Sequence, residues 1–161
     1  MEQLVGPLPL TAQHNVDEFS CGESALDTWL FKHALRAQNA NTARVFVSTE
    51  KSKVVGFYAL ASAALLVKDL PSNQRIDLPR HPIPALLIAR LAVDQGYQNR
   101  GVGLGMIQDA VQRAMQIREH AGLVCLIANA KNQNAQDFYI NAGFEPSPNL
   151  DGLVSLYLPT V

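Results

Sequence analysis

One segment limits the possible folds most strongly. It consists of an almost entirely apolar run at 85–93, a glycine-containing loop, and an amphipathic helix predicted at 102–120. A strand that is apolar along its whole length is typical of strands covered on both faces, as in parallel sheets. A second apolar strand is predicted at 123–128, directly after the helix. These three elements predict a parallel strand pair joined by a helical crossover.

Weaker patterns predict the rest of the fold. Strands are expected at 4–10, 43–48, 54–60, near 144 and at 154–158, and helices at 25–37 and 134–141. Ser20 and Glu23 have the spacing of a capping box, which predicts the start of the first helix. Four prolines make 67–84 a loop. The order β-α-β-β-β-α-β-α-β-β predicts an α/β (α+β) fold, a central mixed twisted sheet with helices on both faces.

Size and cysteine usage narrow the class of protein. The chain has 161 residues, which suits one domain spanning 1–161. We expect neither a membrane span, which needs an apolar run of about 18 residues, nor a secretory signal, because no basic segment precedes an apolar one at the N-terminus. Cys21 and Cys125 lie far apart without a CxxC partner, which predicts free thiols, no metal and a cytoplasmic location.

Charge is spread unevenly along the chain. Residues 1–31 hold five acids and no Lys or Arg, whereas 32–118 hold twelve Lys or Arg and five acids. A basic middle favours a polyanionic cofactor or a nucleic-acid substrate. An ordinary solvated surface would show the same excess, so this observation alone leaves both interpretations open.

The loop between the strand at 85–93 and the helix after it has the features of an anion site. Glycines allow a phosphate to approach the backbone closely, and the first N–H groups of a helix have no partner within it. The spacing of Gly101, Gly103 and Gly105 fits neither the Walker pattern nor the dinucleotide fingerprint. The alternative is a plain turn before a helix.

The segment resembles the GNAT superfamily of N-acetyltransferases. Its (Q/R)-x-x-G-x-(G/A) loop is matched by Gln98, Gly101 and Gly103, and 90–94, Arg-Leu-Ala-Val-Asp, looks like the strand that pairs with pantetheine. The family's second motif is similar to Asn132-x-x-Ala135-x-x-Phe138-Tyr139-x-x-x-Gly143-Phe144. The resemblance covers about 43–158 and implies a GNAT fold and acetyl-CoA as the acetyl donor.

Matching positions carry the family's cofactor roles. Backbone groups of Leu91, Ala92 and Val93 would align the pantetheine arm and stabilise the oxyanion. The pyrophosphate would lie on the loop and helix start, formed by Gln98, Asn99, Arg100, Gly101, Val102, Gly103, Leu104 and Gly105. Asn132, or else Asn134, would bond the arm. Helix capping is the alternative for the asparagines, and an exposed loop charge is the alternative for Arg100.

Tyr139 is the candidate catalytic acid. A phenol with a pKa of about 10 stays protonated at neutral pH and can protonate a leaving thiolate. The alternative is a core tyrosine on an amphipathic helix. No carboxylate stands out as a general base, and Asp94 is expected to act in loop structure. An α-amino group, with a pKa of about 8 before any ester lowers it, needs little help from a base.

The N-terminal third resembles the GNAT-type toxins of bacterial toxin–antitoxin pairs. The similarity lies in Phe19-x-Cys21-Gly22-x-x-x-Leu26-Asp27-x-Trp29-Leu30 and in the strand at 55–60. It implies acetylation of aminoacyl-tRNA, a block of translation, a homodimer, and a ribbon-helix-helix antitoxin through which alone DNA is contacted. The candidate tRNA contacts are Arg36, Arg44, Arg75, Arg80 and Arg90; Cys21 and Trp29 are expected in the core.

Two other functions stay open. The enzyme could acetylate a small amine, a peptide N-terminus or a protein lysine, or the chain could be a non-catalytic module that binds acetyl-CoA or a partner. Tyr139 and the intact glycine loop argue against a silent module. The proline-rich loop at 71–84 holds more basic than acidic side chains, which favours an anionic substrate. The basic ones are Arg75, Arg80 and His81, and the acidic one is Asp77.

Overall fold

The computed structural model describes residues 3–75, 78 and 81–159. Its strands are β1 (Val5–Pro9), β2 (Arg44–Glu50), β3 (Lys53–Leu65), β4 (Ile83–Val93), β5 (Cys125–Asn129), β6 (Glu145–Pro146) and β7 (Leu153–Tyr157). Its α-helices are α1 (Ser24–Lys32), α2 (Ala34–Asn39), α3 (Val102–Arg118) and α4 (Gln133–Asn141), with short 3-10 turns η1 (Val67–Asp69), η2 (Ser72–Gln74) and η3 (Gln95–Tyr97). The predicted element order is confirmed, except that the first helix is two.

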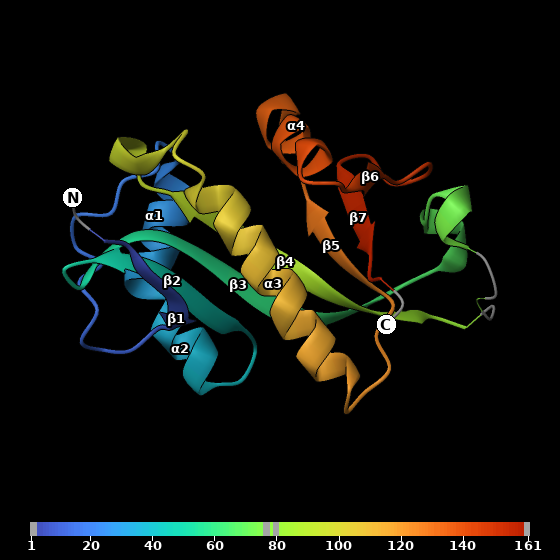
Figure 1. The fold of residues 1–161 in the computed structure, drawn as a ribbon, viewed down its shortest axis with the longest axis horizontal. Helices are drawn as coiled ribbons and strands as arrows, with labels where there is room; N and C mark the ends of the chain where they lie inside the picture. Colours follow the sequence, from blue (N-terminus) through green and yellow to red (C-terminus); the bar gives the residue numbers. More distant parts are fainter. Residues whose placement is uncertain (1–2, 76–77, 79–80, 160–161) are drawn as a thin grey trace. The chain divides into compact units, whose positions relative to one another are not determined.

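The strands form a mixed sheet in the order β1-β2-β3-β4-β5-β7-β6 (Figure 1). β4 and β5 are parallel, from Ala85 opposite Cys125 to Ile88 opposite Ala128. The pairs β1–β2, β2–β3, β5–β7 and β6–β7 are antiparallel. The predicted α/β fold with a mixed sheet and a parallel pair around a helical crossover is therefore confirmed.

The chain divides into two compact units that interleave along the sequence. One comprises Met1–Ala61 and Ala89–Asp109, the other Ser62–Ile88 and Ala110–Val161. β3, β4 and α3 each begin in one unit and end in the other. Each unit has a core of its own.

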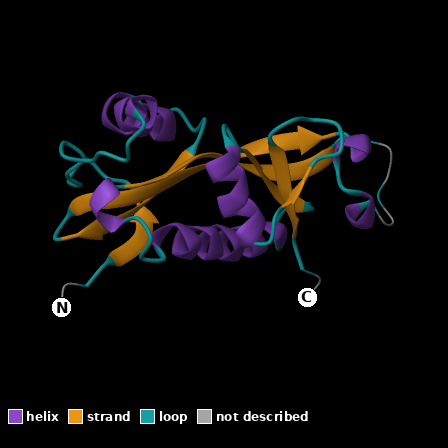
Figure 2. Cartoon of the chain, turned by 90° about the horizontal axis from the view of Figure 1, so that it is seen from above, coloured by secondary structure: helices purple, strands orange, loops and turns teal. Residues whose placement is uncertain are grey.

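In the first unit the sheet has helices on both faces (Figure 2). Side chains alternate along β3. Phe57 packs in a core with Leu30 and Ala34 of α1 and α2, whereas a Cβ on Gly56 would meet Val102 of α3 at 3.0 Å. Phe57 therefore faces α1 and α2, and Gly56 faces the start of α3.

In the second unit the core lies around the parallel pair. Its fully or nearly buried members are Leu65, Leu70, Ile83, Ala85, Cys125, Ile127 and Leu153. Cys125 is a free thiol, and burial raises its pKa to about 12. A neutral buried thiol behaves as a small apolar side chain, as its place in this core requires.

The capping box predicted at Ser20 and Glu23 is wrong. Glu23 itself is the residue before α1, and its side chain makes no capping bond. The carboxylate of Asp27 instead accepts a hydrogen bond from the Cys21 N–H at 2.9 Å. The helix then breaks at His33, whose φ of −121° lies outside the helical range.

Candidate active site

The loop between β4 and α3 presents unpaired N–H groups. Gly101 has a φ of +83° and Asn99 one of +63°, so the chain turns sharply before the helix. The first recorded helical bond runs from the Gly105 N–H to the Gly101 carbonyl, at 2.9 Å. The N–H groups at 102–104 therefore have no helical acceptor. Apart from its own chain neighbours and helix backbone, no atom of the described residues lies within 4 Å of a Cβ built on Gly101 or on Gly105, so the backbone can be approached there.

A segment from the N-terminus fixes this loop in place. The side-chain amide of Gln98 donates to the carbonyls of Cys21, at 3.0 Å, and Val93, at 2.9 Å. Asp94 accepts from the N–H groups of Ser20 and Gly96, both at 3.0 Å, and the Gln95 N–H donates to the Ser20 carbonyl at 2.8 Å. Asp94 thus has the expected role in loop structure.

These bonds give the N-terminal motif a physical meaning that sequence reasoning missed. Phe19 and Leu30 lie in the core of the first unit, with Leu26 and Trp29 packed against it. Gly22, with a φ of +100°, allows the turn that aims the Cys21 carbonyl at Gln98. The signal was the F-x-C-G pattern itself, but its partner lies 77 residues away.

Replacing Gln98 by glutamate is expected to destabilise the protein by about 1 kcal/mol, because a carboxylate cannot donate to the two carbonyls and repels them, although water can reach both at this exposed position. Thermal unfolding measures the effect, and binding of acetyl-CoA should weaken with it. Gln108→Glu, an exposed position on α3, is the matched control. Equal melting temperatures for the two variants would contradict a loop-holding role for Gln98.

The end of β4 turns backbone groups alternately toward and away from β3. The N–H of Asp94 donates to the Val55 carbonyl on β3 at 2.8 Å. Because N–H and carbonyl groups alternate along a strand, the groups of Ala92 also face β3, and those of Leu91 and Val93 face the other side. The pairing of β4 with β5 ends at Ile88, before Leu91 and Val93. Leu91 and Val93 are therefore the better-placed backbone contacts among the predicted three.

The predicted Asn134 and Tyr139 lie on α4, and Asn132 directly precedes this helix, in the second unit. Asn132 caps this helix, and its Oδ1 accepts from the Ala135 N–H at 2.9 Å. Its amide group can still donate, and Asn134 is exposed in the first turn. The structure thus shows the capping alternative for Asn132, without using up its donor.

Tyr139 is 6% exposed, with its ring 5.2 Å from those of Phe138 and Phe144. This burial raises the pKa of its phenol above the ordinary value of 10. Two other tyrosines, Tyr58 and Tyr97, donate to the carboxylates of Asp109 and Glu50. Within the described part of the chain, no hydrogen bond of the Tyr139 hydroxyl is recorded. Tyr139 is therefore a neutral phenol whose proton is not committed elsewhere.

The five candidate arginines differ in how much of their hydrogen-bonding capacity is used. Arg75 donates to the carbonyls of Leu70 and Lys68, and Arg44 donates to the Asn41 side chain at 2.6 Å. Arg36 is exposed on α2, and Arg80 lies outside the described residues. Arg90 has its guanidinium carbon 4.4 Å from the centre of the Trp29 ring. In the loop, Arg100 lies 5.2 Å from the Tyr97 ring in the same manner.

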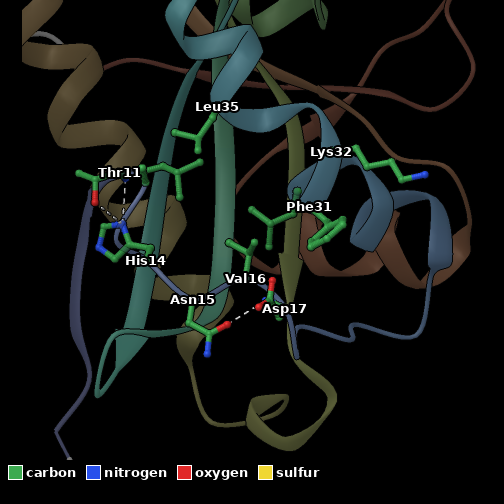
Figure 3. A pocket seen from close by; sticks show the side chains of 11 residues that line it. Thr11, His14, Asn15, Val16, Asp17, Phe31, Lys32 and Leu35 are labelled. Carbon is green, nitrogen blue, oxygen red and sulfur yellow. Dashed lines mark hydrogen bonds between the residues drawn. The ribbon is translucent and has the colours of Figure 1, made fainter.

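A cavity of about 320 Å³ lies elsewhere in the first unit, between residues 10–17 and the two N-terminal helices (Figure 3). His14 accepts from the Thr11 N–H in its wall, and Phe31 and Lys32 border it. None of the predicted site residues lines it. Among the described residues no group of His, Cys, Asp and Glu could hold a metal, and no helix is long and apolar enough to cross a membrane.

Comparison with known proteins identifies relatives across nearly the whole chain. The model of the acetyltransferase (GNAT) domain matches residues 41–146. A tRNA-acetylating toxin of Mycobacterium tuberculosis (strain ATCC 25618 / H37Rv) is 38% identical over 142 residues, which cover 88% of this chain and 85% of that protein. A probable toxin TacT of Sinorhizobium fredii (strain NBRC 101917 / NGR234) is 29% identical, covering 91% and 86%.

Solved structures agree with the sequence matches. AtaT complexed with acetyl-methionyl-tRNAfMet superposes with a TM-score of 0.87 at 25% identity, over 96% of this chain and 94% of that one. AtaTR bound with AcCoA gives a TM-score of 0.81 at 26% identity, over 93% and 91%. The fold of this chain is thus similar to that of AtaT, which has been solved with acetyl-methionyl-tRNAfMet and, as AtaTR, with AcCoA.

Proposed function

Because this chain belongs to the GNAT acetyltransferase family, we propose that it moves an acetyl group from acetyl-CoA to the α-amino group of an aminoacyl-tRNA, and so blocks translation as the toxin of a toxin–antitoxin pair. The observation that carries the proposal is the 38% identity to a tRNA-acetylating toxin over most of both chains. AtaT, similar over almost its whole length, is complexed with the product of such a reaction. The chain is an N-acetyltransferase with acetyl-CoA as donor.

The loop of the first unit suits the pyrophosphate of the donor. The N–H groups at 102–104 and the dipole of α3 would stabilise its charge, with Arg100 close by. Gly101 and Gly105 leave the backbone open, while Gln98 holds the loop and Asn99 makes the turn. Leu91 and Val93 would pair with the pantetheine arm along β4, beside Ala92. Asn132, or else Asn134, would donate to the arm from α4.

Acetyl-CoA supplies an acetyl group activated as a thioester. Backbone N–H groups of Leu91 or Val93 would stabilise the negative charge that develops on the acyl oxygen as the amine nitrogen bonds to the carbonyl carbon. Tyr139 would give its hydroxyl proton to the departing sulfur, and the amine would release its own proton to solvent. Burial raises the pKa of Tyr139, and the same apolar surroundings would also disfavour a bare thiolate, so they favour protonation of the departing sulfur.

The acceptor proposal also fits the charge of the chain. Arg36, Arg44, Arg75 and Arg90 belong to the basic stretch at 32–118. The amine of an aminoacyl ester is only weakly basic, so much of it is neutral near pH 7 and it can react without a dedicated carboxylate base. From the resemblance in the N-terminal motif we further propose a homodimer in the cytoplasm, neutralised by a ribbon-helix-helix antitoxin that alone contacts DNA.

The test is to incubate the purified chain with acetyl-CoA and a pool of charged tRNAs, and to identify N-acetyl-aminoacyl-tRNA by mass spectrometry. Acetylation of one or more charged tRNAs, with none of uncharged tRNA, is the expected result. Acetylation of a polyamine, a peptide N-terminus or a protein lysine, with no charged tRNA modified, would instead establish the alternative acetyltransferase function.

A further inference from the structure

The Arg90 side chain packs on a group of aromatic rings that reaches into the core of the first unit. Its guanidinium carbon lies 4.4 Å from the Trp29 ring centre. Trp29 is stacked on Phe57, with ring centres 6.0 Å apart and planes 12° from parallel. Phe57 is fully buried, and Phe19 packs edge-on against it at 5.5 Å. The planar guanidinium therefore has a fixed support, which lowers the entropy it loses on binding a ligand.

The hydrogen-bonding groups of this guanidinium have no partner in the described chain. No hydrogen bond or ion pair of Arg90 is recorded there, whereas Arg75 and Arg44 both donate to oxygen atoms of the protein. Partial burial disfavours the Arg90 charge and lowers the pKa of its guanidinium below the ordinary arginine value. An anion is the ligand that would satisfy both its charge and its planar set of N–H donors.

The position of Arg90 points to the acceptor rather than the donor. The N-terminus of α3, with its candidate phosphate site, packs on the face of the sheet where Gly56 meets Val102. Arg90 lies on the opposite face, with α1 and Trp29. Leu91 follows it directly on β4, and its backbone is a proposed contact of the reacting group. A substrate that approaches this backbone from the α1 face passes the Arg90 guanidinium.

We propose that Arg90, positioned by Trp29, binds a phosphate at the 3′ end of the aminoacyl-tRNA, close to the aminoacyl ester. This inference rests on the proposed function and assigns one residue within it. The phosphate of the terminal nucleotide is the anion nearest the ester, so a contact there would place the α-amino group at the end of β4. Arg90 thereby binds substrate, and Trp29 is a positioning residue.

Salt dependence distinguishes a phosphate contact from a structural role. Each phosphate neutralised on a single strand contributes about 0.7 to the slope of log affinity against log salt. For Arg90→Gln we expect kcat/KM for charged tRNA to fall about tenfold and KM for acetyl-CoA to stay unchanged. The slope of log affinity for tRNA against log salt should decrease by about 0.7. Arg118→Gln, which removes the same charge from a residue bonded to the Pro159 carbonyl, is the control.

Two further measurements locate the contact. An aminoacylated CCA trinucleotide should show the same loss with Arg90→Gln as the full tRNA does, since the contact lies at the 3′ end. Trp29→Phe should raise KM for charged tRNA when Arg90 is present. It should add little to the effect of Arg90→Gln in the double variant, because Trp29 acts through the contact that Arg90 makes. Unchanged thermal unfolding and acetyl-CoA binding show that the variants are folded.

The outcomes are separable. If the native chain acetylates charged tRNA and Arg90→Gln matches Arg118→Gln in salt slope, this inference is wrong while the proposed function stands. A loss seen with full tRNA but absent with the trinucleotide would also overturn it, because the contact would lie elsewhere on the tRNA. If the native chain acetylates neither substrate, the proposed function itself fails.

Discussion

Tyr139→Phe is expected to lower kcat for aminoacyl-tRNA acetylation by about 10²–10⁴-fold, the usual contribution of a general acid. The substitution removes only the hydroxyl, for which no hydrogen bond is recorded among the described residues, and keeps the ring between Phe138 and Phe144. Binding of acetyl-CoA and the melting temperature should therefore change little. Single-turnover rates with saturating acetyl-CoA measure the effect.

Tyr157→Phe is the matched control, since Tyr157 is 41% exposed on β7. The pH profile gives a second test. Burial raises the pKa of Tyr139 above its ordinary 10, so the phenol remains protonated, and competent, as the pH rises to about 10. The rate should rise near the pKa of the substrate amine and show no fall below that pH. A fully active Tyr139→Phe would remove the tyrosine from the mechanism.

Gly101→Val is expected to weaken acetyl-CoA binding by about a hundredfold, or about 2.8 kcal/mol. Two effects combine. A φ of +83° disfavours any residue with a Cβ, and the valine would fill the open space beside Gly101 that the proposed phosphate site needs. Isothermal titration calorimetry measures the affinity directly.

Gly143→Val separates these effects. Gly143 has a φ of +105°, and among the described residues its added Cβ would meet Leu156 alone, at 3.6 Å. It should therefore be destabilised as Gly101→Val is, but should bind acetyl-CoA almost normally. Equal losses of affinity in the two variants would mean that backbone strain, and not the blocked loop, explains the result.

The part of the fold predicted best has purely local causes. The strand predicted at 85–93 matches β4 closely, the helix at 102–120 matches α3, and the strand at 123–128 matches β5. A continuous apolar run and a glycine loop indicate these elements without any knowledge of the segments that pack against them. The strand at 54–60 was too short. β3 continues to Leu65 through Ala61, Ala63 and Ala64, and alanine is a poor indicator of a strand.

Long-range contacts explain what could not be predicted. Ser20 and Glu23 had the spacing of a capping box, yet the Ser20 N–H is bonded to Asp94, 74 residues further on. The loop motif identified Gln98, but nothing in the motif shows that its amide donates to protein carbonyls. Likewise, Arg75 and Arg90 look alike in the sequence, and only the structure separates a guanidinium held by backbone carbonyls from one resting on Trp29.

The interleaving of the two units has a consequence for how the protein is made. The unit that carries the glycine loop needs Met1–Ala61 together with Ala89–Asp109. A growing polypeptide cannot complete it until residue 109 has left the ribosome, and Tyr139 is synthesised later still. Products that terminate before residue 109 would thus lack a complete first unit, and an enzyme proposed to stop translation could begin to act only after Tyr139 has been synthesised.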